Sequence, residues 1–224
     1  MSMFAELLRS NYIFLLDVYL LLITEVVISL LVFVKIVGPF KEYVKINVTN
    51  VIISIVTFAG IFILMEIFNM PKWLKLSLLY FAIIVEGFLL YFLTMKVDYL
   101  VILSFLTDTI IMYIVMLFII TLTVSFECQI EFLTFALICI ISGCIAIKLA
   151  PNHNGKTVFD IKKSPAQYFA GYGVTVLFVT YLVYYTKNLI HKKHNHDIVG
   201  GLSDLYLGFP KVMRQMFLYD DKKI

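Results

Sequence analysis

Five carboxylic acids occur within or at the ends of long apolar stretches of this sequence. They are Asp17, Glu25, Glu66, Glu86 and Asp108. A carboxylate in an apolar medium is costly, so such a side chain faces the protein interior, pairs with another group, takes up a proton or lines water. No lysine or arginine falls near the centre of these stretches. We therefore treat the acids as candidates for an ion path, together with Asp204 near the C-terminus.

The spacing of polar residues in the first apolar stretch predicts a polar stripe on one side of a helix. Asp17 lies seven residues before Thr24 and eight before Glu25, and Ser29 follows one turn later. Residues at these separations share a helix face. Asp17 and Glu66 lie near the ends of their stretches, where simple solvation explains them equally well. Glu25, Glu86 and Asp108 fall deeper and are the stronger candidates.

Other groups that could do chemistry lack a supporting pattern. His191, His194 and His196 with Asp197 resemble a metal or pH-sensing patch, but their spacing in a hydrophilic connection fixes no ligand geometry. The three cysteines form no CxxC pair and no readable disulfide framework. The sequence also contains no HExxH or GxSxG signature. We expect no enzyme activity, no cofactor and no metal centre.

The composition is typical of a protein that lies in a lipid bilayer. Hydrophobic residues make up 62% of the chain and charged residues only 15%, with a mean hydropathy of +0.96. A soluble domain could not cover its surface with so few polar groups. The net charge of +3 comes from scattered lysines, without the dense basic run of a nucleic-acid binder. Nucleic acid is therefore not an expected partner, whereas the lipid bilayer is.

Apolar stretches separated by short polar connections predict six transmembrane helices in a single multipass domain, residues 1–224. The predicted spans cover about residues 12–37, 48–68, 73–94, 99–125, 132–149 and 166–185. Each is near the length of about 20 residues that crosses a bilayer. Lysines are almost evenly divided between the two sides, so the charge distribution leaves the orientation open.

The last apolar stretch, residues 198–219, differs from the others because glycine, proline and charged residues interrupt it. They are Gly200, Gly201, Asp204, Gly208, Pro210, Lys211 and Arg214. A charged side chain at the bilayer centre costs about 2.5 to 3.5 kcal/mol on insertion scales. Broken backbone is tolerated at membrane depth only where protein or water surrounds it. We therefore expect an all-α six-helix bundle around a semi-hydrophobic seventh helix or re-entrant segment.

Four stretches of the chain together resemble the Bax inhibitor-1 family, which includes the Golgi anti-apoptotic proteins. LFVTYLVYYTKNLI (177–190) and HDIVGGLSDLYLGFPKVMRQMFLY (196–219) resemble its C-terminal signature, in which a helix ending in a V-Y-D-T-like motif precedes a segment with an L-Y-L-D-like motif. FLLDVYLLLIT (14–24) resembles the family's F-L-x-x-V-Y start. Glu86 and Gly87 resemble its E-G pattern. The resemblance covers nearly the whole chain.

The resemblance implies a protein of endoplasmic reticulum or Golgi membranes that inhibits apoptosis and modulates calcium release. In the family, two C-terminal aspartates form a pH-responsive pair that closes a calcium-permeable path. The matching positions here are Tyr185 and Gly208, and the basic residue often found in the family's second helix is also missing. Without that pair the same proton-switched closure is not expected, unless Asp204 takes over part of the role. The small, divergent chain suits a virus-encoded member.

Three functions stay open at the level of sequence. The first is the Bax-inhibitor-like function, with calcium ions as partners. The second is a non-conducting scaffold that binds host or partner membrane proteins through small residues on its helix faces. The third is a small proton-coupled transporter that uses the deep acids as coupling groups.

Overall fold

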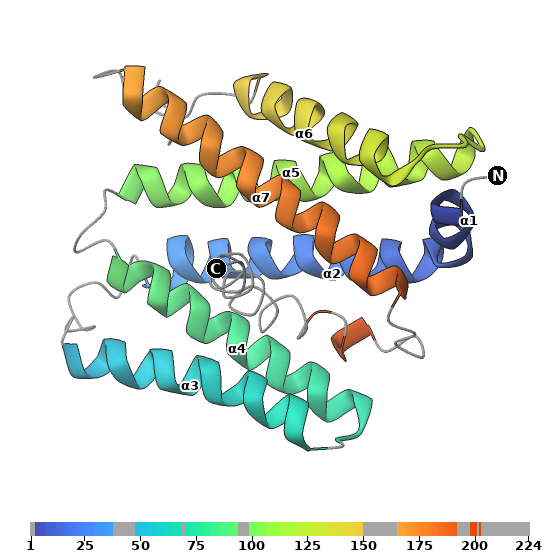
Figure 1. The fold of residues 1–224 in the computed structure, drawn as a ribbon. Coiled ribbons are helices and arrows are strands. Elements are labelled where there is room, and N and C mark those ends of the chain that lie inside the picture. Colours follow the sequence, from blue (N-terminus) through green and yellow to red (C-terminus); the bar gives the residue numbers. More distant parts are fainter. Residues whose placement is uncertain are drawn as a thin grey trace, which may run out of the picture.

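The computed structural model describes residues 3–37, 48–68, 70–93, 99–149, 165–191, 198–200 and 202. The elements in this part of the chain are all helical (Figure 1). They are α1 (Met3–Ser10), α2 (Tyr12–Leu31), the π-helix η1 (Val32–Val37), α3 (Val48–Ile67), α4 (Lys72–Leu93), α5 (Tyr99–Ser125), α6 (Phe132–Leu149) and α7 (Pro165–His191). The all-helical class predicted from the sequence is confirmed for these residues.

Four helical stretches are long and apolar enough to cross a membrane. They are Tyr12–Lys35, Val48–Met65, Lys72–Phe92 and Phe105–Ser125. α6 contains a shorter apolar stretch, Phe132–Ala146. A helix satisfies its own backbone hydrogen bonds, as a spanning segment in lipid must. The chain therefore has the character of an integral membrane protein, while six spans around a seventh segment stay a prediction.

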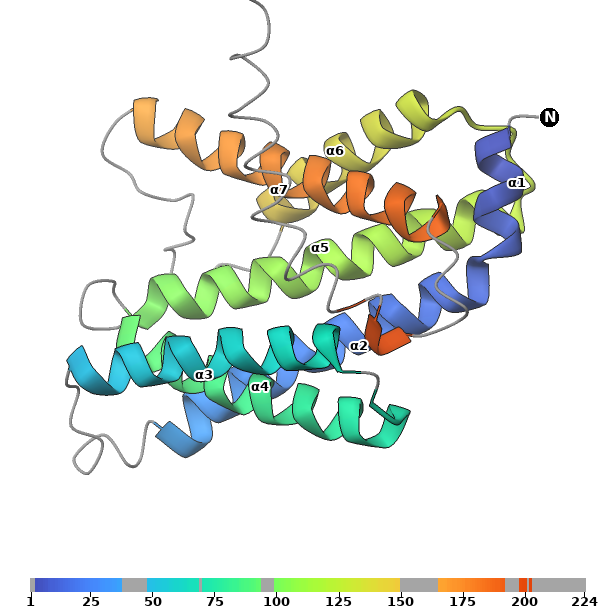
Figure 2. The ribbon, with the colours of Figure 1, turned by 60° about the horizontal axis from the view of Figure 1, so that its bottom comes forward.

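α2 is the central helix of the bundle. It packs against α4 on one side and α5 on the other, and α3 packs on α4. α6 packs on α5, and α7 packs on α6. Figure 1 accordingly shows α3 and α4 on one side of α2 and α5, α6 and α7 on the other, and Figure 2 shows α4 crossing α2. Polar groups on α2 can therefore meet partners from several helices.

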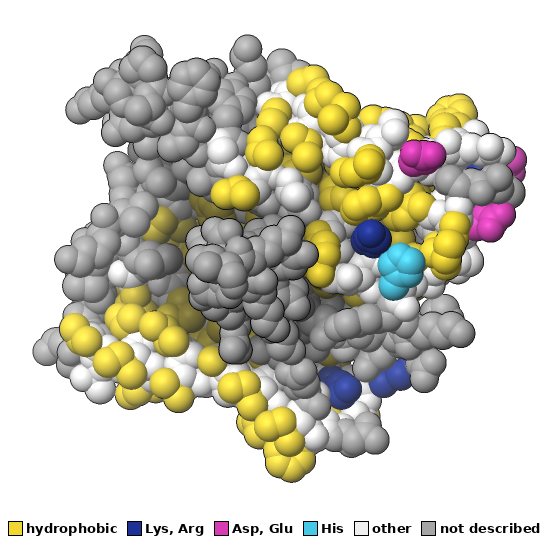
Figure 3. Space-filling view, viewed as in Figure 1, with side chains coloured by type: hydrophobic (Ala, Val, Ile, Leu, Met, Phe, Trp, Pro, Cys, Tyr) yellow, Lys and Arg dark blue, Asp and Glu magenta, His cyan; other side chains and the backbone are white. Residues whose placement is uncertain are grey.

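α2 is a core helix and α3 is a peripheral one, as the buried share of their residues shows. In its apolar stretch α2 has 44% of its residues buried, compared with 17% for α3. Large apolar side chains of α3, including Ile52, Ile53 and Val56, are exposed. Figure 3 shows hydrophobic side chains along this edge of the molecule. In a bilayer these side chains meet acyl chains, because lipid is as apolar as they are.

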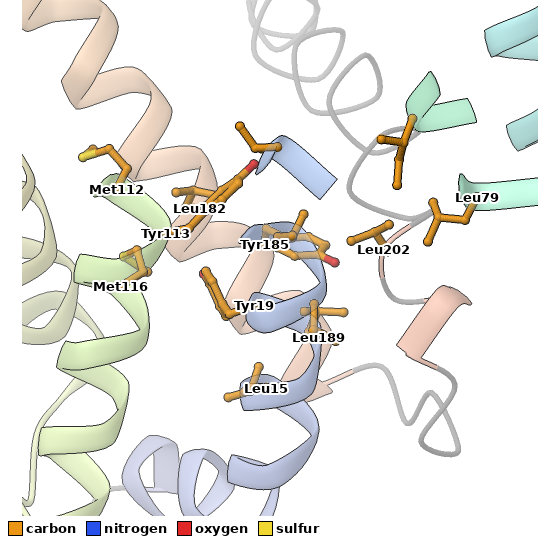
Figure 4. Packing of buried hydrophobic residues seen from close by; sticks show 14 of the residues in the cluster. Leu15, Tyr19, Leu79, Met112, Tyr113, Met116, Leu182, Tyr185, Leu189 and Leu202 are labelled. Carbon is orange, nitrogen blue, oxygen red and sulfur yellow. The ribbon is translucent and has the colours of Figure 1, made fainter. Parts of the chain in front are cut away.

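The described beginning of the last segment lies in the core. Val199 is buried and Leu202 is completely buried, and both belong to the main hydrophobic cluster. Figure 4 shows Leu202 between Tyr185 of α7 and Leu79 of α4. The prediction that residues 198–219 form a central or re-entrant segment stays a prediction, because most of them lie outside the described residues. Asp204 and Gly208 lie outside the described residues.

Two local features were not predicted from the sequence. The short helix α1 buries Ala5 and Leu8 and packs on α5. Its chain then turns at Asn11, whose side-chain Nδ2 donates a hydrogen bond of 2.9 Å to the Leu7 carbonyl. The second feature is η1, which continues α2 as a π-helix from Val32. Such wide turns occur often at functional sites, and this one adjoins the polar residues described next.

Candidate functional site

Two of the predicted acids come together in the interior, from α2 and α4. Glu25 is only 1% exposed, and Ser29 lies one turn later on the same helix with no exposed surface. The Ser29 hydroxyl donates a hydrogen bond of 2.9 Å to Oε2 of Glu86, which is partly buried. Glu25 lies within electrostatic range of Glu86. We call Glu25, Ser29 and Glu86 the carboxyl pair site.

A glycine beside Glu86 lets α4 approach α2 closely at this site. A Cβ added to Gly87 would lie 2.5 Å from Cγ1 and 2.7 Å from Cβ of Val32. Real Cβ atoms are not found at such distances, so any larger residue would push the two helices apart. Val32 is the first residue of η1, and its backbone N–H bonds to the carbonyls of both Ile28 and Ser29. The π-helix, the glycine and the carboxyl pair site are therefore one contiguous feature.

Tyr113 of α5 faces the same site. Its side chain is 6% exposed and lies within electrostatic range of both Glu25 and Glu86. Figure 4 shows its hydroxyl pointing toward α2. A phenolic O–H is both donor and acceptor, so Tyr113 can serve either acid.

A second polar contact links α2 to α7 further along the bundle. The hydroxyls of Tyr19 and Thr186 form a hydrogen bond of 2.8 Å, and both side chains are completely buried. The rings of Tyr19 and Tyr113 meet edge to face, with centroids 6.3 Å apart. Cys139 of α6 lies within electrostatic range of Tyr19. A line of polar side chains therefore runs from α4 through α2 and α5 to α7.

Asp108 lies apart from this line. It is 6% exposed, and its Oδ2 has no hydrogen-bond partner in the part of the chain that the structure describes. Met112 lies one turn after Asp108 on α5. A Cβ built at Gly143 of α6 would touch both Met112 and Val179 of α7, so the three helices meet at this point. Asp108 thus shares the face of α5 that turns toward α6 and α7, away from the carboxyl pair site.

The predicted polar stripe on α2 is wrong at Thr24. Its side chain is exposed and donates a hydrogen bond of 2.8 Å to the Leu20 carbonyl, whereas the adjacent Glu25 is buried. Consecutive helix residues are about 100° apart, and the rotation of α2 in the bundle turns Thr24 outward while Glu25 and Val26 are both buried. Asp17 is partly buried. The side chain of Glu66 lies outside the described residues.

Tyr185, at the position that matches a gating aspartate in the resembled family, is an apolar-core residue here. It is 4% exposed and stacks on Tyr181 with ring centroids 6.5 Å apart. Its hydroxyl points toward Leu202 in Figure 4. An aromatic ring and not a carboxylate therefore faces the start of the last segment.

Comparisons with known proteins add no relative to this picture. No family model, curated protein or solved structure matches the chain. The site is accordingly interpreted from its own geometry.

The chemistry that the site offers is that of oxygen ligands and protons. Among the described residues no group of three or more histidine, cysteine or acidic side chains could hold a metal ion. Sequence reasoning missed Tyr19, Tyr113 and Thr186, because tyrosine and threonine in apolar stretches are usually packing residues. Their only sequence signal is that they carry hydroxyl groups at depths where each must find a partner.

Proposed function

We propose that this chain is a Bax-inhibitor-like multipass protein of endoplasmic reticulum or Golgi membranes that inhibits cell death and modulates the release of stored calcium. The proposal includes the six-helix arrangement around a seventh segment and membership, as a divergent and virus-encoded relative, of the Bax inhibitor-1 family. The observation that carries it is the burial of Glu25 on α2, one turn before Ser29, whose hydroxyl donates to Glu86 of α4 between helices apolar enough to cross a membrane. Intramembrane acids that face the interior mark ion or proton pathways.

The structure gives a physical reason for the E-G pattern on which the resemblance partly rests. Glu86 turns to the Ser29 hydroxyl, and Gly87 provides the close approach to Val32 that brings α4 onto α2. Both residues are thus needed at one point of helix contact. This supports the resemblance at that motif.

Calcium flux tests the ion-handling part of the proposal. The full chain is reconstituted into vesicles loaded with a calcium-sensitive dye, and release is compared with empty vesicles. We expect release above the empty-vesicle background, reduced at least severalfold by Glu25→Gln and by Glu86→Gln. Each substitution keeps the side-chain shape and removes the charge. Glu131→Gln, at an exposed acid outside the carboxyl pair site, is the matched control and should retain release.

Cell survival and imaging test the part of the proposal that concerns inhibition of cell death and the membrane compartment. Cells that express the chain are challenged with an intrinsic apoptosis stimulus, and compartment markers are imaged in the same cells. Protection together with reticular or Golgi staining is expected. Staining confined to the plasma membrane, or survival equal to that of untransfected cells, would contradict the proposal.

A non-conducting scaffold is the second candidate, and the burial of Tyr185 favours it. At this position the resembled family uses a carboxylate, whereas here a ring packs on Tyr181 in the core. Protection of cells without any calcium release from vesicles would support the scaffold. A proton-coupled transporter, the remaining alternative, would acidify the same vesicles when a proton gradient is applied.

A further inference from the structure

The short helix α1 lies at the end of the bundle where two of the apolar stretches have their limits. The stretch of α2 begins at Tyr12, and that of α5 ends at Ser125. The hydroxyls of Tyr12 and Thr121 are 3.3 Å apart, so both limits belong to the same end of the bundle. Figure 2 shows α1 crosswise at this end. In a bilayer this is the level at which a membrane-crossing stretch meets the lipid headgroups.

An aromatic cluster joins α1 to α6 and α7 at this level. The ring of Phe4 meets the rings of Phe132 and Phe135 of α6, each with centroids 5.4 Å apart. The Nζ atom of Lys187, near the end of α7, lies 4.4 Å from the centroid of the Phe132 ring. Three helices therefore meet around one aromatic ring, and one of them brings an ammonium group to it.

A second basic side chain follows Lys187 on the same face of α7. His191 lies one turn later and is exposed, whereas Lys187 is partly buried. Figure 3 shows a lysine or arginine side by side with a histidine on this face of the molecule, among hydrophobic side chains. The end of α7 thus presents two hydrogen-bond donors next to apolar surface.

Arg9, at the end of α1, has one edge of its guanidinium without an acceptor. Its Nε and Nη2 atoms are buried and have no hydrogen-bond partner among the described residues. These two nitrogens carry the parallel N–H groups that bind a phosphate or carboxylate as a fork. A guanidinium keeps its charge at physiological pH, so a shift of its pKa cannot remove the need for an anion. We call Arg9, Lys187 and His191 the basic collar.

The surroundings of the basic collar combine exposed acids with exposed apolar side chains. Glu6, Glu127 and Glu131 are exposed, and an ion pair in such a position contributes little because water and salt screen it. Phe126 and Leu133, which flank the connection between α5 and α6, are 73% and 77% exposed. In a bilayer such side chains meet acyl chains. A ligand that offers an anionic group next to acyl chains is a phospholipid.

We propose that the basic collar binds the phosphate group of an anionic phospholipid, whose acyl chains lie against Phe126 and Leu133. Lys187 and His191 donate to the phosphate from α7, and Arg9 turns its long side chain to it from α1. The lipid thereby connects α1 to α7 at the membrane surface. This binding site is separate from the carboxyl pair site, and the proposal does not depend on calcium release.

Lipid retention by the purified full-length protein tests the proposal. The protein in neutral detergent is mixed with phosphatidylglycerol and phosphatidylcholine that have the same acyl chains, and bound lipids are counted by native mass spectrometry. We expect a preference for phosphatidylglycerol that falls about fivefold in Arg9→Gln and in Lys187→Gln, the effect of one basic residue near an anionic membrane surface. Lys187→Arg should retain the preference. Lys72→Gln, which removes an exposed lysine of α4 outside the basic collar, is the matched control.

Three results would overturn the proposal. Equal retention of the two lipids by the wild type would mean that no anionic lipid is selected. A loss of preference in Lys72→Gln equal to that in Lys187→Gln would mean that any surface charge has the same effect. Displacement of phosphatidylglycerol by inorganic phosphate would make a soluble anion the occupant. Lys187 is only partly buried, so its variants serve if Arg9→Gln does not fold. The lipid count involves no transport, so its outcome is independent of whether vesicles release calcium.

Discussion

Ser29 on α2 donates its hydroxyl hydrogen to Oε2 of Glu86 on α4, over a distance of 2.9 Å. The two residues are 57 positions apart in the sequence, so the bond exists only when both helices are in place. It connects the central helix of the bundle to the α3–α4 hairpin at the point where an acid enters the interior.

Replacement of Ser29 by alanine should destabilise the protein by about 1 to 3 kcal/mol, the cost of leaving a polar group inside without its partner. Thermal unfolding in detergent measures the effect. Ser77→Ala is the matched control, because Ser77 is exposed and bonds only to the carbonyl of Trp73 one turn earlier. Equal midpoints for the two variants would show that the Ser29 bond is unimportant.

Replacement of Gly87 by alanine should cost about 1 to 3 kcal/mol, as overpacking does in a close-packed core. The added Cβ would overlap Val32, so the double variant Gly87→Ala with Val32→Ala should recover part of the loss. Gly60 of α3 has nothing within 4 Å of its built Cβ. Gly60→Ala should therefore be neutral or stabilising by about 0.5 to 1 kcal/mol. The prediction would be contradicted if Gly60→Ala destabilised the protein and Gly87→Ala did not.

A double-mutant cycle of Tyr19→Phe and Thr186→Val should give a coupling energy of about 0.5 to 1.5 kcal/mol between α2 and α7. Each single substitution removes one hydroxyl of the 2.8 Å bond and keeps the shape of the side chain. Tyr12 and Thr121, whose hydroxyls are 3.3 Å apart in a partly buried position, provide a weaker comparison pair. Additive effects of the Tyr19 and Thr186 substitutions would mean that no such bond contributes.

Asp108→Asn should raise the unfolding temperature while it reduces calcium release. The substitution replaces an ionisable carboxyl by a neutral amide at a buried position where Oδ2 has no hydrogen-bond partner among the described residues, and a neutral polar group costs less to bury than a charged one. Functional residues in a membrane interior commonly carry such a cost. A less stable variant would indicate that Asp108 contributes to the folded structure itself.

Glu127→Gly should stabilise the turn after α5 by about 1 kcal/mol, because Glu127 has a φ of 51°, a conformation that favours glycine. The backbone N–H groups of Glu127 and Cys128 bond back to the carbonyls of Val124 and Thr123, which is the Schellman arrangement at a helix end. Unfolding in detergent checks the shift. Glu131→Gly, at a neighbouring exposed acid outside the left-handed region, should give no stabilisation.

The helices could be predicted from the sequence because each apolar stretch is bounded by turn residues and charges. The α1 helix could not, because eight residues are too few for a distinct pattern, and the π-helix η1 carries no compositional signal. Glu25 and Glu86 could each be selected as a deep acid from its position alone. Their placement at one interface, where Ser29 of α2 bonds to Glu86 of α4, could not, since it depends on how the two helices pack around Gly87.

The directions in which side chains point also depend on how the helices pack, so they could not be predicted from the sequence. Thr24 and Glu25 were assigned to one stripe, but only the rotation of α2 in the bundle determines which of the two is buried. Tyr113 was overlooked because an apolar stretch rich in aromatic residues suggests packing, and its relation to the acids appears only in three dimensions. Tyr185 was selected by resemblance, and its stacking on Tyr181 gives that position an aromatic and not an acidic character.

The outer position of α3 makes it the place to attach a reporter. Ile53 and Val56 are exposed, so a probe there would touch acyl chains and leave the interior undisturbed. With the exposed Cys128 first replaced, Ile53→Cys would accept a spin label whose accessibility to lipid-soluble and water-soluble quenchers measures its depth. A shift of the α3–α4 hairpin against α2 would then be measured as a change in the accessibility of this label to the quenchers.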